Sequence, residues 1–72
     1  MVPMTELKFR CPDMHFLADA LDVERKLFRS PGVYEVQIDH VSGKVRVLTA
    51  NQDGGVDVRR TLAAAGFPAE LY

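Results

Sequence analysis

The sequence contains one cysteine, no tryptophan and no long hydrophobic run. A single thiol, that of Cys11, excludes an internal disulfide and any metal site built from two thiolates of this chain. The longest uninterrupted apolar segment is the four residues Leu62 to Ala65. About 20 such residues are needed to cross a bilayer, so we expect no membrane insertion of this segment. The low cysteine content favours a reducing compartment, the cytoplasm.

The chain also lacks an excess of charge of either sign. Nine basic and ten acidic side chains give a net charge of −1. No strong field is therefore available to attract nucleic acid or anionic lipid. Leucine, isoleucine, valine and phenylalanine together make up 21 of the 72 residues. This share exceeds the roughly 20% below which disorder is expected. We expect one folded domain over residues 1–72, with its core at about 5–71.

The hydrophobic pattern changes period several times along the chain. Alternation predicts strands at 5–11, 33–39, 44–49 and 67–71, whereas helical periodicity predicts helices at 15–29 and 56–65. Pro12 and Gly66 mark two of the boundaries. The polar, glycine-rich segment Ala50–Gly55 is expected to be mobile.

One face of each element is predicted to be buried. On the strands the inward-facing side chains are expected to be Leu7, Phe9, Cys11, Tyr34, Val36, Ile38, Val45 and Val47. On the first helix the apolar stripe is Phe16, Ala20, Val23 and Leu27, widened by Leu17, Leu21 and Phe28; on the second it is Val58, Leu62 and Ala65.

The order β-α-β-β-α-β predicts an α+β fold, the ferredoxin-like two-layer sandwich. A four-stranded antiparallel sheet should carry both helices on one face, with the first and third strands at its centre. The connection His40–Gly43 is a predicted hairpin turn. We expect His40 to contact solvent, at the opposite end of the domain from the loop around Pro12.

Several short motifs, correctly spaced over residues 5–71, carry a resemblance to a known family. They are Asp13–Asp19, Val23–Glu24, Pro31–Val33, Gly43–Val47 and Ala65–Phe67. Together they resemble the heavy-metal-associated domain of copper chaperones and of the N-termini of metal-transporting P-type ATPases. The resemblance implies a monomeric binding module of a metal transport system, not an enzyme. It also implies a partner, a metal-transporting ATPase or a metallochaperone, engaged through the first loop and helix.

The chain departs from this family at the metal site. The family pattern is Gly-Met-x-Cys-x-x-Cys, and counting back from Pro31 places Phe16 and Asp19 at the two cysteine positions. Aligning Cys11 and Met14 there instead would require a five-residue insertion in the helix. A benzyl group cannot donate to a metal, so tight Cu(I) binding of the family kind is not supported. Phe16 is expected to fill or cover the spot with apolar surface.

Other candidate ligands lie nearby. His15, Asp19 and Asp22 are spaced i, i+4 and i+7, which places them on one face of a regular helix. One imidazole and carboxylates suit a divalent ion such as zinc, bound weakly. A solvated helix face with an acidic first turn explains the same residues without a metal.

Two sulfur side chains stand before the helix and have alternative explanations. Met14 matches the family methionine, which implies a core anchor under the loop, and a ligand role is the alternative. Cys11 occupies an inward strand position, typical of a small apolar side chain. It could join Met14 and His15 as a ligand, of copper or zinc, if the loop folded back. Phe67 matches a family aromatic near this loop, and core packing explains it equally well.

Two other functions fit the same topology. RNA-binding domains of this order stack bases on aromatic side chains of the open sheet face. Here the outward residues of the central strands are Lys8, Arg10, Lys44 and Arg46, with no aromatic among them. A regulatory domain that senses a small molecule is the other alternative. No nucleophile–base arrangement, P-loop or G-x-G-x-x-G is present.

Overall fold

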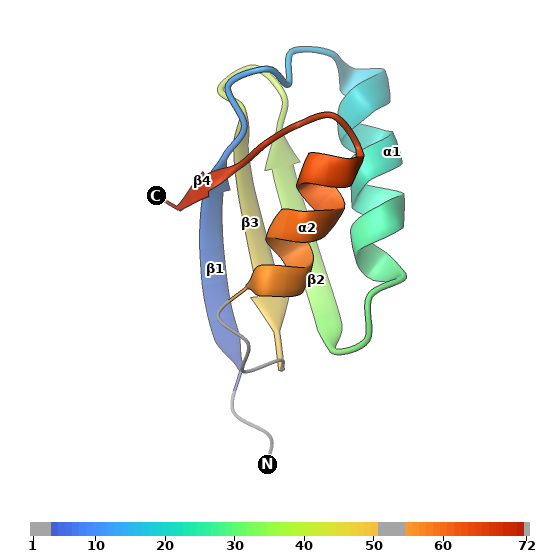
Figure 1. Ribbon diagram of the computed structural model, residues 1–72, viewed down its shortest axis with the longest axis vertical. Helices are drawn as coiled ribbons and strands as arrows, with labels where there is room; N and C mark the ends of the chain where they lie inside the picture. The colour runs from blue at the N-terminus through green and yellow to red at the C-terminus, as the bar shows by residue number, and fades with distance from the viewer. Residues whose placement is uncertain (1–3, 51–54, 72) are drawn as a thin grey trace.

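The computed structural model describes residues 4–50 and 55–71 of the chain. Its elements are β1 (Thr5–Arg10), α1 (Leu17–Phe28), β2 (Val33–Asp39), β3 (Lys44–Thr49), α2 (Val56–Ala64) and β4 (Glu70–Leu71). The strands form one antiparallel sheet in the order β2-β3-β1-β4, and both helices cover the same face of it (Figure 1). The predicted ferredoxin-like arrangement is confirmed, including the central position of β1 and β3.

The fourth strand is much shorter than predicted. Within the part of the chain that the structure describes, strand pairing at this edge is limited to Glu70 and Leu71, which lie opposite Arg10 and Phe9 of β1. Pro68 has no backbone N–H to donate, so the chain before Glu70 cannot continue the ladder. The sheet therefore consists of three full strands and a two-residue edge.

The core lies between the helices and the sheet. Its buried members are Leu7, Phe9, Cys11, Met14, Ala20, Val23, Leu27, Val36, Val45, Val47, Val58 and Leu62. Each strand contributes alternate residues, as the period-2 pattern requires. The one buried polar residue among the described ones, Thr49, donates its hydroxyl to the carbonyl oxygen of Gly32 at 3.1 Å, which satisfies it.

The buried stripe of α1 is narrower than predicted. Ala20, Val23 and Leu27 are buried as expected. Phe16 and the residues that were expected to widen the stripe, namely Leu17, Leu21 and Phe28, are exposed. Only one narrow line of a helix can touch a flat sheet, so the flanking apolar residues remain in water.

Tyr34 is also misplaced by the sequence pattern. The β2–β3 register shifts between Val33 and Glu35, which pair with the consecutive residues Thr49 and Leu48. Tyr34 is the extra residue of this bulge, and its side chain is exposed. A bulge breaks the strict alternation of a strand, so alternation alone predicted the wrong face.

The connections follow their turn chemistry. At the end of α2, Gly66 has φ +92°, its N–H bonds to Ala63 O, and Phe67 N–H bonds to Leu62 O. This is the Schellman pattern that glycine after a helix favours. The mobility predicted for Ala50–Gly55 concerns mainly residues 51–54, which lie outside the described residues. Neither α1 nor α2 is long and apolar enough to cross a membrane.

Candidate functional site

Two loops meet at the end of the molecule where the candidate site lies. The connection from β1 to α1 and the β2–β3 hairpin lie side by side at the top of Figure 1. The N–H of Cys11 donates to the carbonyl oxygen of Gly43 at 2.7 Å and ties the two loops together. The expectation that His40 lies at the opposite end is therefore wrong. Because β1 and β3 are antiparallel, the end of β1 meets the start of β3 and its hairpin.

The hairpin itself is held by Asp39. Its carboxylate accepts hydrogen bonds from the N–H of Val41 at 3.0 Å and of Ser42 at 3.4 Å. These hydrogen bonds lower the pKa of Asp39 below its usual range, and the bond from Val41 has the largest effect. A carboxylate that closes its own turn in this way is occupied as an acceptor.

The first loop begins with a tight turn that directs two sulfur atoms inward. Met14 N–H donates to Cys11 O at 3.1 Å, with Pro12 and Asp13 between them. Proline followed by aspartate is favoured at the centre of such a turn. Cys11 and Met14 are both fully buried in the core. The structure therefore assigns both sulfur side chains to packing in this conformation.

Burial also changes the acidity of the only thiol. Loss of water raises the pKa of Cys11, and the nearby carboxylate of Asp13 raises it further. A soft metal binds the thiolate, so a raised pKa opposes metal binding. Cys11 in this position behaves as a small apolar side chain.

The remaining candidate ligands face outward and do not converge. Helix α1 begins at Leu17, two residues later than predicted, and its N-cap is Phe16 with extended backbone. His15 therefore precedes the helix, and the helical spacing to Asp19 and Asp22 does not apply to it. Within residues 4–50 and 55–71, no three His, Cys, Asp or Glu side chains come close enough together to hold a metal ion.

The two aspartates of α1 have separate environments. Asp19 is half-buried in the first turn, where a carboxylate suits the positive end of the helix dipole. Asp22 forms an i,i+4 ion pair with Lys26 at 2.9 Å. The hydrogen bond from Lys26 is the main cause that lowers the pKa of Asp22. Both positions are explained by helix chemistry without a metal.

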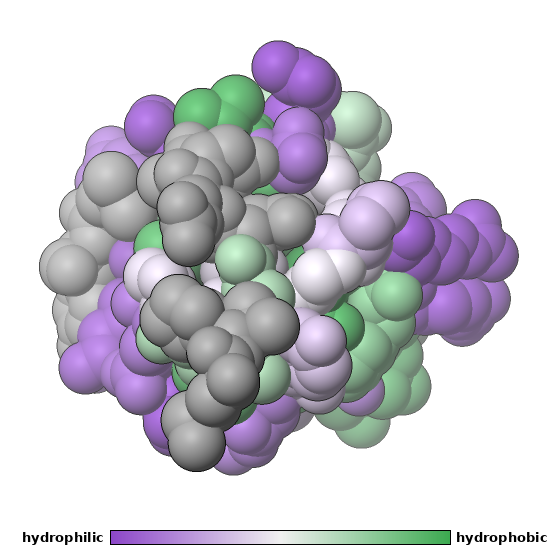
Figure 2. Space-filling view, turned by 90° about the horizontal axis from the view of Figure 1, so that it is seen from below, coloured by the Kyte–Doolittle hydropathy of each residue, from purple (hydrophilic) through white to green (hydrophobic). Residues whose placement is uncertain are grey.

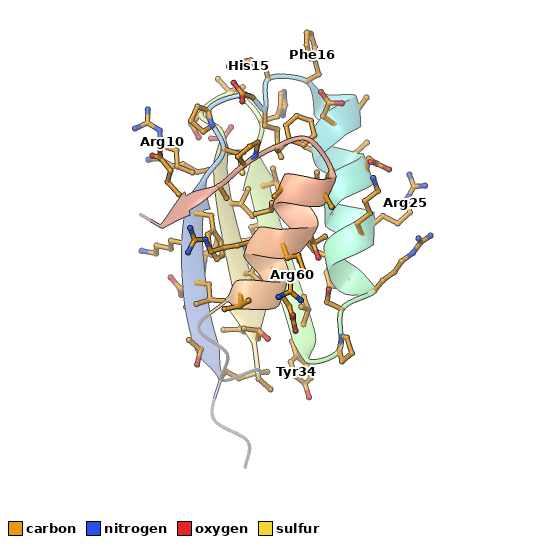
Figure 3. All side chains as sticks on the ribbon, viewed as in Figure 1. Arg10, His15, Phe16, Arg25, Tyr34 and Arg60 are labelled. Atoms are coloured by element: carbon orange, nitrogen blue, oxygen red, sulfur yellow. The ribbon has the colours of Figure 1, made fainter. Side chains whose placement is uncertain are left out.

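The two aromatic residues near the loop differ sharply. Phe16, which the sequence motifs predict to stand at the first of the family's two cysteine positions, is 69% exposed, and it lies with His15 at the tip of the molecule (Figure 3). The expected apolar cover over the site is therefore absent. Phe67 is partly buried and packs against the core. Sequence reasoning missed Gly43 and His40 as neighbours of this loop, although the antiparallel β1–β3 pairing would have placed them there.

The open face of the sheet is the other surface that could bind a ligand. A shallow depression of about 420 Å³ lies there, lined by Lys8, Phe9, Gln37, Ile38, Asp39, Lys44, Val45 and Arg46. The carboxylate of Glu6 forms ion pairs with Arg46 at 3.0 Å and with Lys8 at 3.6 Å. Glu6 partly neutralises these two cations, and β1 and β3 carry no outward-facing aromatic side chain. This face of the sheet therefore offers little that could stack on or bind a nucleic-acid base.

Comparison with solved structures gives many close matches. The N-terminal domain of ZntA in its Zn(II) form is 27% identical, with a TM-score of 0.85 over 93% of this chain and 90% of that chain. Oxidized MerP from Ralstonia metallidurans CH34 is 17% identical, with a TM-score of 0.85 over 96% of this chain and 97% of that chain. A putative copper-ion-binding protein from Bacillus anthracis str. Ames is 17% identical, with a TM-score of 0.86 over 97% of this chain and all of that chain, 100%.

No family model matches the sequence, and no curated protein matches it. The matched structures are heavy-metal-associated domains, so the resemblance indicated by the sequence motifs is confirmed at the level of the fold.

Proposed function

We propose that this domain is a metal-handling module of the heavy-metal-associated type that has lost the family's two-thiolate site. It would act as a metallochaperone-like protein or as the N-terminal domain of a metal-transporting P-type ATPase. The observation that carries the proposal is the start of α1. The backbone of this segment has the fold of the metal-binding neighbours. Phe16 is the N-cap residue and Asp19 lies in the first turn, at the positions where the family has cysteines.

Metal binding by such a site is weak and favours zinc over Cu(I). His15 and Asp19 are the accessible donors at the tip, and an imidazole with a carboxylate suits Zn²⁺. The soft donors Cys11 and Met14 are buried, so Cu(I) could reach them only if the loop opened. Water would complete the coordination shell of any bound ion.

The main role of the module is then docking through the first loop and α1. A metal-transporting ATPase or a metallochaperone is the expected kind of partner, in the cytoplasm. The helix offers both apolar and charged side chains at this surface. The proposed function is binding rather than catalysis.

Competition titrations test the metal part of the proposal. The protein is titrated with Zn(II) and Cu(I), each against a chelator of known affinity. We expect zinc binding weaker than about 1 µM and weaker Cu(I) binding still, because two thiolates are missing. Submicromolar Cu(I) binding by the monomer would overturn the loss of the site.

Restoring the two cysteines tests the alignment. The double variant Phe16→Cys/Asp19→Cys should gain tight Cu(I) binding, because the two sulfurs would stand at the N-cap and in the first turn. Asp22→Cys/Arg25→Cys has the same spacing six residues further along α1 and is the matched control. No gain in the first variant, or an equal gain in the control, would show that the loop is misaligned.

A further inference from the structure

We draw no further inference here: the strongest candidate, the exposed apolar face of α1 formed by Leu17, Leu21 and Phe28, on the side of the molecule where Figure 2 shows hydrophobic side chains beside a hydrophilic projection, carries none because nothing in the part of the chain that the structure describes shows what covers it.

Discussion

The side chains of the first loop that point into the core differ in chemistry and in burial from those that point outward. On the inner side, Cys11 and Met14 are soft ligands by type, but both are fully buried and serve as packing. On the outer side, the side chains of His15 and Phe16 are exposed to solvent and that of Asp19 is half-buried, so they contribute little to packing. The comparison shows that ligand type alone does not make a metal site. The donors must also converge at an accessible point, and here the two sulfur side chains are buried in the core whereas His15 lies outside it.

The largest effect expected from this comparison is on stability. Met14→Ala should lower the free energy of unfolding by about 2–5 kcal/mol, since it leaves a cavity in the core. Phe16→Ala should change it by no more than about 0.5 kcal/mol, because the ring is exposed. Urea unfolding followed by circular dichroism measures both. If Met14→Ala does not fold, the volume-conserving Met14→Leu should still cost less than about 1.5 kcal/mol. Equal effects at positions 14 and 16 would abolish the distinction.

The next effect concerns the hairpin that supports the inner side. Gly43 has φ +75°, and a Cβ there would overlap the carbonyl oxygen of Cys11. Gly43→Ala should therefore cost more than backbone strain alone and should displace the loop. Gly66→Ala is the matched control, because its φ is +92° but no atom lies within 4 Å of a Cβ. The free energy of unfolding of the control variant should fall by about 1–2 kcal/mol. A smaller loss at Gly43 than at Gly66 would contradict the packing of the hairpin against Cys11.

A smaller effect should follow the titration of Cys11. Its pKa is raised in the folded protein, so below the ordinary thiol pKa both states hold the proton and stability is complete. Above about pH 8.5 the unfolded thiol ionises first, and stability should fall as the pH rises. Unfolding in urea at pH 7 and at about pH 9.5 measures the loss, and Cys11→Ala should remove this part of it. Rapid reaction of the folded protein with a thiol reagent would show that Cys11 is accessible.

The smallest effect belongs to the outer side. Asp22→Asn removes the ion pair with Lys26, which is exposed at both ends. We expect a barely measurable change in the melting temperature at low salt and none at high salt, because water and ions screen such pairs. Asn at position 22 should also leave zinc affinity unchanged if Asp22 serves only the helix. A clear loss of zinc binding would instead make it a ligand.

The sequence predicted the elements better than the surfaces. The bounds of β2 and β3 agree with the alternation of Val36, Val45 and Val47, since a half-buried strand needs that period. Tyr34 was placed on the wrong face because a bulge adds a residue without a clear mark in the sequence. Phe16 and Leu21 were placed in the core because apolar periodicity gives the direction of a helix stripe but not how much of it the sheet can cover.

The candidate site was only partly predictable for a similar reason. The prediction that Phe16 and Asp19 stand at the two cysteine positions comes from the order of residues before Pro31 and needs no coordinates. The proximity of Gly43 to Cys11 depends on the pairing of β1 with β3, which joins residues about thirty positions apart. Local patterns do not contain such distances.

The sequence by itself therefore determined the succession of strands and helices, the single thiol and the absence of the paired cysteines. These properties depend on neighbouring residues and on composition. Only the tertiary structure decided that Cys11 and Met14 are buried, that the hairpin of His40 lies beside the first loop, and that α1 leaves an apolar line in water. Burial and proximity depend on which surfaces meet when distant segments pack, and that is fixed by the whole fold rather than by any one segment.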